Sequence, residues 1–278
     1  MTNHVHNRVL IVTGAGGGFG RQICMIAARR GAHIVGGDID AAALAETVAL
    51  ITDEGGSAVG QPTDVRSAAE MDALVAFAVH THGRIDVLVN NAGTMPLAFF
   101  ADHARAREAW DRCIDINFKG VLNGINAVHD QMIEQGRGQV VNISSIYGNV
   151  ATVGAGVYTA TKAAVNILSD TLRAESQGRI KVTNVRPTGV PGTGLGAGMI
   201  NGAGITGILG QNFTEYVDTI TAAMAGELPA SATDPDSIGY WAITPEQLAE
   251  AVVHAIDQPW GISISDITVR ASGDRFLF

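Results

Sequence analysis

The sequence is poor in the residues that mark disulfide-stapled, metal-binding or nucleic-acid-binding proteins. Its 278 residues include two cysteines, Cys24 and Cys113, which lie far apart and form no C-x-x-C pair. We therefore expect neither a disulfide framework nor a metal site, and we predict the reducing cytoplasm as the compartment. The formal net charge is −9 and no run of lysine and arginine occurs. That balance argues against a nucleic-acid partner and against an anionic membrane surface.

Long apolar runs are missing as well. The first residues, MTNHVHNR, lack the apolar core of a signal peptide, and the run RVLIVTG that follows is too short to supply one. No stretch approaches the length that spans a membrane. Hydrophobic residues make up 46% of the chain and charged residues 16%, which is typical of a globular protein. The length is one at which a single α/β domain is common, so we expect one domain over residues 1–278.

What the chain does contain is an alternation of short β-branched runs with stretches of helical periodicity. Strands are predicted at 8–13, 32–38, 57–65, 85–90, 138–145, 179–185 and 264–271. Helices are predicted at 21–31, 41–56, 68–82, 102–135 with a break, from before Tyr158 to about 177, and at 244–256. Strands that alternate with helices indicate βαβ units and a parallel sheet buried on both faces.

A glycine-rich turn joins the first predicted strand to the first helix. Residues 13–20 read TGAGGGFG, and glycine lets the backbone turn sharply and lets a ligand approach it closely. The free N–H groups and the dipole of a helix N-terminus attract a pyrophosphate. A glycine cluster by itself indicates only a tight turn, but between a strand and a helix it favours dinucleotide binding. The predicted contacts are Gly14, Gly18, Phe19 and Gly20.

The next predicted strand ends in Asp38, about 20 residues after the glycines, where a carboxylate can accept hydrogen bonds from the adenosine ribose. The same carboxylate would repel a 2′-phosphate, and the neighbouring Gly17 and Ile39 offer no cation for one. We therefore predict NAD rather than NADP as the cofactor. The alternative role, the N-cap of the following helix, suits Asp40 better.

Two further strand ends carry candidate cofactor contacts. Asp64 and Val65 close the third predicted strand, where they would either meet the adenine or form a surface turn. The fourth strand ends in two asparagines followed by Ala92 and Gly93. Ligands bind at this carboxyl edge in doubly wound folds, whereas an Asn pair also favours a plain turn. The residues predicted to contact the cofactor here are Asn91, Ala92 and Gly93.

The stretch 145–162 carries the acid–base candidates. Tyr158 and Lys162 are four residues apart and share one helix face. An ammonium about 4 Å from the phenol, at an effective dielectric of about 20, favours the phenolate by up to ~4 kcal/mol. This would lower the tyrosine pKa by up to ~3 units and allow proton exchange near neutral pH. Ser145 could hold the same substrate oxygen, although a Y-x-x-x-K pair alone is more often a solvated helix face.

Two other features need an explanation. Asn117 lies between Ile116 and Phe118 in a helical stretch, so we expect it to be buried and hydrogen-bonded, for structure alone or as part of a proton path. The segment 188–240 is irregular and holds nine glycines between Gly189 and Gly210. Such a segment is either a linker or a functional loop. Its place after a strand end favours a lid over the active site.

Together these motifs resemble the short-chain dehydrogenase/reductase family, in its short single-domain branch. The resemblance extends from Arg8 to about Arg270 and rests on residues 13–20, Asp38, Asp64–Val65, 90–93, Asn117, Ser145 and 158–162. It implies that Ser145 orients the substrate oxygen and that Tyr158 is the acid and base. It also implies that Lys162 binds the nicotinamide ribose and lowers the tyrosine pKa, and that Asn117 supports a water chain.

The resemblance further implies a doubly wound Rossmann-type sheet in the order 3-2-1-4-5-6-7, with helices on both faces, and a homotetramer or homodimer. Cofactor contacts are implied at Pro187, Val190 and Thr193, and substrate contacts at Met95, Ile146 and Tyr147. Two departures from the family pattern stand out. Thr188 occupies a position where glycine is usual, and DITVRASGDRFLF replaces the usual C-terminal Val-Asp-Gly-Gly element.

The function predicted from the sequence is NAD-dependent interconversion of a small secondary alcohol and a ketone. A non-catalytic NAD-binding sensor on the same fold is the alternative, although it would need none of the acid–base residues. A serine hydrolase is disfavoured because neither Ser144 nor Ser145 lies in a G-x-S-x-G turn. An epimerase or dehydratase of the extended branch fits the single-domain length less well.

Overall fold

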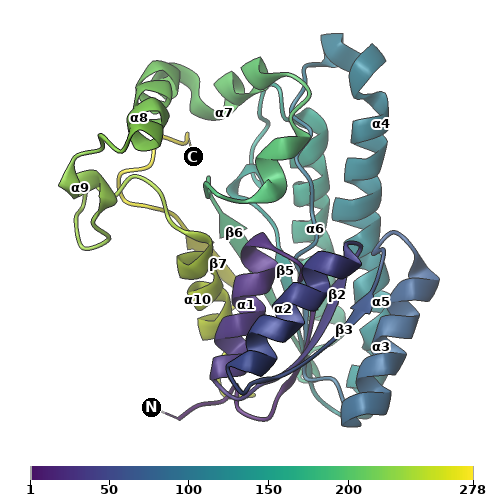
Figure 1. Cartoon of the computed structure of the whole chain (residues 1–278). Coiled ribbons are helices and arrows are strands. Elements are labelled where there is room, and N and C mark those ends of the chain that lie inside the picture. The colour runs from purple at the N-terminus through teal and green to yellow at the C-terminus, as the bar shows by residue number, and fades with distance from the viewer. Residues whose placement is uncertain (1, 278) are drawn as a thin grey trace.

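A seven-stranded parallel sheet in the order β3-β2-β1-β4-β5-β6-β7 forms the centre of the molecule. The computed structural model describes residues 2–277, and Figure 1 shows helices covering both faces of this sheet. The predicted fold and strand order are confirmed. The strands are β1 (Val9–Thr13), β2 (His33–Asp38), β3 (Ser57–Pro62), β4 (Val87–Asn90), β5 (Gly138–Ile143), β6 (Ile180–Pro187) and β7 (Asp266–Val269).

The helices divide between the two faces of the sheet. Helices α1, α2 and α10 pack on one face, α3, α5 and α6 on the other, and α4 packs beside α6 (Figure 1). Their bounds are α1 (Gly18–Arg29), α2 (Ala41–Asp53), α3 (Ala68–His82), α4 (His103–Ile114), α5 (Gly120–Glu134), α6 (Gly156–Glu175), α7 (Thr206–Leu209), α8 (Phe213–Ala225), α9 (Ala230–Thr233) and α10 (Pro245–Ile256). The predicted helix over 68–82 is confirmed residue for residue.

Strand β1 shows why the apolar runs form the middle of the sheet. Its successive side chains point to opposite faces, as a strand requires. Val12 belongs to the apolar core under α1 and α10, and Ile11 belongs to the core under α3 and α5. Because both faces are covered, every residue of β1 is buried.

Strands β3, β5 and β7 end earlier than predicted, and the first two carry candidate site residues at their ends. The β3 strand stops at Pro62, because Thr63 donates its hydroxyl to Gln61 O at 2.8 Å and Ser67 N then donates to Asp64 O, which turns the chain. The β5 strand stops at Ile143, and Ser144 and Ser145 lie in the loop that follows. Residues 63–65 and 144–145 therefore lie in loops at the carboxyl edge of the sheet.

The helix ends follow the local sequence more closely. The predicted break inside 102–135 is a π-helical turn, Asp115–Lys119, between α4 and α5. At the start of α10, Thr244 accepts from Gln247 N and Gln247 accepts from Thr244 N, which is a capping box with Pro245 in the first turn. Thr244 is therefore the N-cap of α10.

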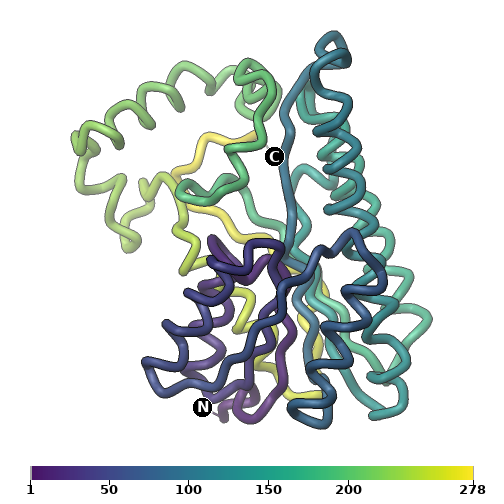
Figure 2. The backbone as a smooth tube through the Cα atoms, turned by 45° about the vertical axis from the view of Figure 1, so that its right-hand side comes forward, coloured from purple at the N-terminus to yellow at the C-terminus, as the bar shows by residue number. Residues whose placement is uncertain are grey.

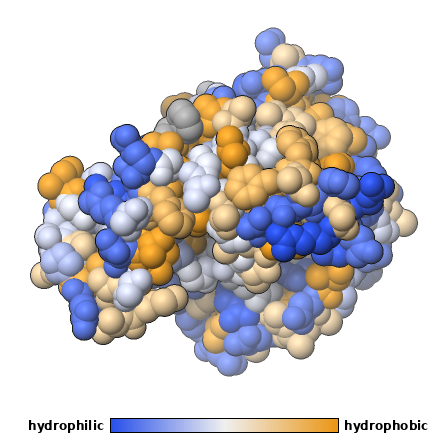
Figure 3. Space-filling view, turned by 90° about the horizontal axis from the view of Figure 1, so that it is seen from above, coloured by the Kyte–Doolittle hydropathy of each residue, from blue (hydrophilic) through white to orange (hydrophobic). Residues whose placement is uncertain are grey.

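The segment 188–240 lies over the carboxyl edge of the sheet and carries α7, α8 and α9 (Figure 1). The chain beyond β7 returns beneath this segment, as the yellow trace in Figure 2 shows. In the view from above, apolar side chains (orange) lie exposed on this part of the molecule beside polar ones (Figure 3). Within residues 2–277, no helix is long and apolar enough to cross a bilayer.

Candidate active site

A cavity of about 570 Å³ opens at the carboxyl edge of the sheet, between the strand ends and the segment 188–240. Most of the residues predicted for the site line it: Gly14, Gly18, Phe19, Asp38, Asn91, Ala92, Gly93, Met95, Ser145, Tyr147, Tyr158, Lys162, Pro187, Val190 and Thr193. Gly20, Asp64, Val65, Asn117 and Ile146 do not line it.

The glycine turn at one end of the cavity is held by short backbone contacts. Gly14 has φ +66°, a conformation that residues with a Cβ rarely adopt. A Cβ on Gly20 would lie 1.9 Å from the Gly14 carbonyl oxygen, so helix α1 packs directly on the turn. Asn91 Nδ2 donates to Thr13 O at 2.9 Å and joins the end of β4 to this turn. Gly20 thus shapes the turn without touching the cavity.

The N-terminus of α1 at this turn fits a pyrophosphate. No side chain caps it, and its N-cap residue, Gly17, has open space where a Cβ would stand. Free N–H groups and the positive end of the helix dipole therefore meet the cavity where backbone can approach an anion closely.

Asp38 lines the cavity beside the turn. Its carboxylate accepts from Gly16 N at 2.8 Å and from Asp40 N at 2.9 Å, which fixes its orientation and leaves lone pairs for diol hydroxyls. The nearby Arg21 guanidinium is engaged by Gly16 O and by Glu46, both at 2.6 Å. Asp40 accepts from the first-turn amides of α2, so the N-cap role predicted for Asp40 is confirmed.

Asp64 and Val65 have partners outside the cavity. The guanidinium of Arg66 pairs with the Asp64 carboxylate at 2.5 Å and holds the pKa of that carboxyl below its usual range. Val65 is buried against α5, where Asn123 Nδ2 donates to its carbonyl at 2.9 Å. These contacts match the surface-turn alternative for Asp64.

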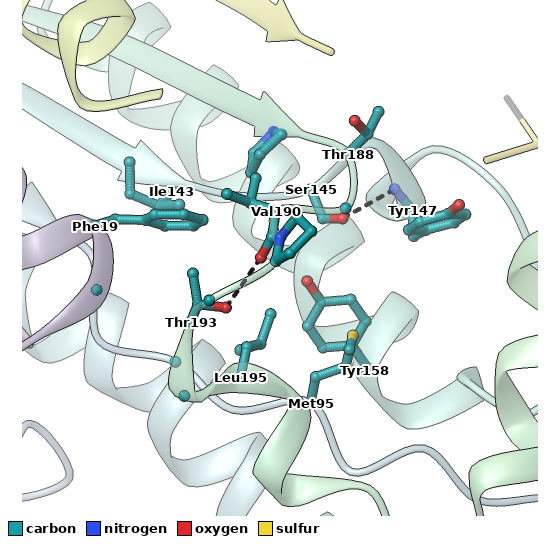
Figure 4. Close-up of a pocket in the computed structure, with 18 of the residues that line it drawn as sticks. Phe19, Met95, Ile143, Ser145, Tyr147, Tyr158, Thr188, Val190, Thr193 and Leu195 are labelled. Carbon is teal, nitrogen blue, oxygen red and sulfur yellow. Dashed lines mark hydrogen bonds between the residues drawn. The ribbon is translucent and has the colours of Figure 1, made fainter. Parts of the chain in front are cut away.

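Ser145 and Tyr158 direct their hydroxyls to the same part of the cavity, as Figure 4 shows. Both residues are buried, and Ser145 Oγ also accepts from Tyr147 N at 3.2 Å. The neighbouring Ser144 hydroxyl lies 2.7 Å from Asn166 Oδ1 and 3.2 Å from the Lys162 carbonyl. Ser144 is therefore engaged with α6, which leaves Ser145 to act with Tyr158.

Burial sets the protonation of the tyrosine–lysine pair. Burial raises the pKa of Tyr158 to about 12, and the hydrogen bond with Ser145 opposes that rise. Burial lowers the pKa of Lys162 to about 8. The Lys162 ammonium donates to Ile143 O at 2.7 Å and lies 5.8 Å from the centre of the Tyr158 ring. The phenol pKa is therefore not lowered in this structure as expected, because loss of solvent outweighs the hydrogen bond with Ser145.

Asn117 lies in the π-helical turn and is fully buried, as expected. Its Oδ1 accepts from Thr94 N and its Nδ2 donates to Thr94 O, each at 2.9 Å. The amide therefore fixes the chain that follows Gly93, on the cavity wall beside Lys162. These contacts give Asn117 a structural role, and its part in a proton path stays a prediction.

The other end of the cavity is apolar. Met95 and Tyr147 line it, and Ile146 packs in the same apolar cluster without lining the cavity. The substrate contact of Ile146 stays a prediction. A 3₁₀ turn starting at Ile146 swings Tyr147 toward the cavity instead. The rest of this wall comes from the segment 188–240, which was predicted as a lid without individual residues, and from the chain end, which was not predicted. The residues are Leu195, Met199, Ile205, Ile208, Tyr216, Ile220 and Phe276.

A family model described as short chain dehydrogenase matches residues 8–204. An uncharacterized oxidoreductase of Listeria monocytogenes is 33% identical over 265 residues, which cover 95% of this chain and 96% of the relative. Another from Staphylococcus saprophyticus is 32% identical over 271 residues, covering 97% and 98%.

Solved structures share the architecture. An alcohol dehydrogenase from Thermococcus sibiricus, complexed with 5-hydroxy-NADP, superposes with a TM-score of 0.78 at 20% identity and covers 98% of this chain and 100% of its own. A short-chain dehydrogenase/reductase from Burkholderia phymatum, in complex with NAD, gives a TM-score of 0.74 at 25% identity, with 96% and 90% covered. The first likeness is one of fold alone.

Proposed function

Because the chain belongs to the short-chain dehydrogenase/reductase family, we propose that it is an NAD-dependent oxidoreductase that interconverts a small secondary alcohol and a ketone. One observation carries this proposal. The hydroxyls of Ser145 and Tyr158 and the ammonium of Lys162 line the same cavity as the glycine turn and Asp38. A carbonyl oxygen between the two hydroxyls would lie next to a bound nicotinamide.

The residues at the polar end would hold the cofactor. The turn around Gly14 and Gly18 would receive the pyrophosphate, Asp38 the adenosine ribose, and Lys162 the nicotinamide ribose. When bound, the reduced nicotinamide supplies a hydride to the carbonyl carbon. The protein's contribution is to position the substrate and to supply the proton.

Tyr158 would supply that proton in the direction of ketone reduction. With a pKa raised to about 12, its phenol remains protonated at neutral pH. Its Oη would release the proton to the carbonyl oxygen, while Ser145 Oγ donates a hydrogen bond to the same oxygen. In the reverse direction the phenolate must form first, and the ammonium of Lys162 stabilises it.

Asp38 supports NAD over NADP, because its carboxylate would lie beside a 2′-phosphate. Like charges at such a distance repel by a few kcal/mol, so the Asp38→Ser variant should narrow the preference for NADH over NADPH roughly 10–100-fold. Dissociation constants from nucleotide fluorescence measure this. The matched control is Asp40→Ser, since Asp40 caps α2 and does not line the cavity. An unchanged preference in the Asp38 variant would contradict the assignment.

The remaining features of the proposal follow from the family. We propose that residues 1–278 form a single domain, with residues 188–240 as a substrate lid, and that the protein works in the cytoplasm as a homotetramer or homodimer. Asp64 and Val65 would approach the adenine from outside the cavity described above. Mass measurement by light scattering tests the oligomeric state.

Turnover is the test that separates this enzyme from an NAD-binding sensor. Purified protein should oxidise NADH when given cyclic or aromatic ketones and reduce NAD when given the matching secondary alcohols. Binding of NADH without turnover across such a panel would favour the sensor. If the protein bound neither NAD nor NADH, both the enzyme and the sensor would be contradicted.

A further inference from the structure

The end of the chain forms part of the wall of the cavity. We call residues 271–277 the C-terminal tail. Phe276, in this tail, lines the cavity and covers Gly189, where an added Cβ would lie 1.9 Å from the phenyl ring. The ring also packs edge-on against Tyr216 of α8, with 5.4 Å between the centroids. Phe276 therefore lies between the start of the lid, at Gly189, and helix α8 of the same lid.

A buried carboxylate fixes the tail in this position. The Asp274 side chain is 2% exposed and pairs with Arg270 at 2.5 Å. Its second oxygen accepts from the Thr188 hydroxyl at 3.0 Å, and Arg270 also donates to the Phe276 carbonyl at 3.1 Å. The two departures from the family pattern, Thr188 and the C-terminal sequence, are thus in direct contact.

The outer side of the tail is bonded to the lid. Arg275 pairs with Glu215 of α8 at 2.5 Å, and Asn212 Nδ2 donates to the Arg275 carbonyl at 2.9 Å. Leu277 N donates to Ile208 O at 3.2 Å, while the Leu277 side chain packs on Gly210 and does not line the cavity. Phe276 therefore faces the cavity, whereas its neighbours Arg275 and Leu277 contact the lid.

The charges around the cavity restrict what can lie against Phe276. Of the described residues that line it, only Asp38 and Lys162 carry a charge. Asp38 lies by the glycine turn and Lys162 beside Tyr158. The wall formed by Tyr216, Ile220 and Phe276 contains no cation that could pair with a carboxylate or phosphate. A buried, unpaired anion is costly, so this compartment selects an uncharged group.

We propose that Phe276 is a specificity-determining residue and that the substrate is an uncharged carbonyl compound whose apolar group packs on Phe276 and Tyr216. This inference rests on the proposed reaction and names its substrate class. The tail sets the depth of the apolar compartment, and the Thr188–Asp274 hydrogen bond positions the tail.

The test uses three ketones that share one reacting group: acetophenone, the larger 4-acetylbiphenyl and the anionic 4-acetylbenzoate. The wild type should prefer acetophenone to 4-acetylbenzoate in kcat/KM by about 10-fold or more. Phe276→Ala should raise the ratio of kcat/KM for 4-acetylbiphenyl over acetophenone by about 10-fold or more, with NADH affinity unchanged. Leu277→Ala, the matched control in the same tail, should leave that ratio within about 2-fold.

Two further variants guard against a loss of folding. Phe276→Leu keeps an apolar side chain and should move the ratio in the same direction by less. Thr188→Val replaces the hydroxyl that donates to Asp274, and it should also raise the ratio of kcat/KM for 4-acetylbiphenyl over acetophenone. An unchanged ratio in a folded Phe276→Ala protein, an equal shift in Leu277→Ala, or a wild-type preference for 4-acetylbenzoate would overturn the proposal.

Calorimetric titration of the same ketones separates this inference from the proposed reaction. If the wild type shows no turnover while Phe276→Ala still tightens 4-acetylbiphenyl relative to acetophenone, the cavity wall is as described and the reaction is wrong. If turnover occurs and neither turnover nor binding responds to Phe276, the reaction stands and the specificity role is wrong.

Discussion

The two ends of the cavity are built in opposite ways. The glycine turn and Asp38 of the polar end come from one continuous stretch, β1, the turn, α1 and β2, in which α1 buries side chains along its length. The apolar end comes from the lid and the C-terminal tail, and α8 contains no fully buried residue. The difference indicates that the dinucleotide end is held rigidly by the core. The substrate end is held by a few long-range contacts and can vary without disturbing the sheet.

Among the variants that compare the two ends, the largest effect is expected where the ends meet, at Ser144 and Ser145. Ser145→Ala removes the hydroxyl directed toward Tyr158, so kcat should fall roughly 10²–10³-fold, as for loss of one donor to a developing oxyanion. Ser144→Ala is the matched control. It loses a buried hydrogen bond to Asn166, which should cost about 1 kcal/mol of stability and little kcat. Steady-state kinetics and urea unfolding measure both, and equal losses of kcat would show that Ser145 has no special role.

At the dinucleotide end of the cavity, one added methyl group should lower both stability and NADH affinity. Gly20→Ala places a Cβ 1.9 Å from Gly14 O, between backbone segments that cannot separate freely. Overpacking of this kind costs about 1–3 kcal/mol, and NADH binding should weaken with it. Gly17→Ala has no atom within 4 Å of the new Cβ and should keep its melting temperature. A stable Gly20→Ala protein with normal NADH affinity would contradict the inference that the core holds the dinucleotide end rigidly.

A smaller effect concerns pH. The folded-state pKa of Lys162, about 8, lies below the ordinary value of 10.5, so above about pH 8 the unfolded chain holds more protons. The contribution of Lys162 to the free energy of unfolding should therefore rise between about pH 8 and 10.5. Below pH 8 the folded protein bears the whole free-energy cost of burying the charged ammonium. Relative to Lys162→Met, the wild type should gain about 1–2 kcal/mol from pH 7.5 to 9.5. Urea unfolding at both pH values measures this, and a constant difference would mean that burial does not control Lys162.

The sequence predicted features whose causes are local. The helix over 68–82 and the Asp40 cap of α2 follow from periodicity and from hydrogen bonds within a few residues. The strand order is not local, and it was predicted only through the family resemblance. The phenol pKa was mispredicted because residue spacing shows the lysine charge but not the desolvation of Tyr158. Phe276 was missed because the contact that fixes the tail, Thr188 to Asp274, joins residues 86 positions apart. Neither end of that contact carries a periodic pattern.

The measurement that tests the account most directly is the Tyr158→Phe variant, assayed for both NADH binding and ketone reduction. The phenyl ring keeps the packing of a buried side chain and removes only the proton donor. We predict an NADH dissociation constant close to that of the wild type and a loss of kcat of roughly 10²–10⁴-fold. A variant that retains near-normal kcat would contradict the assignment of Tyr158 as the acid.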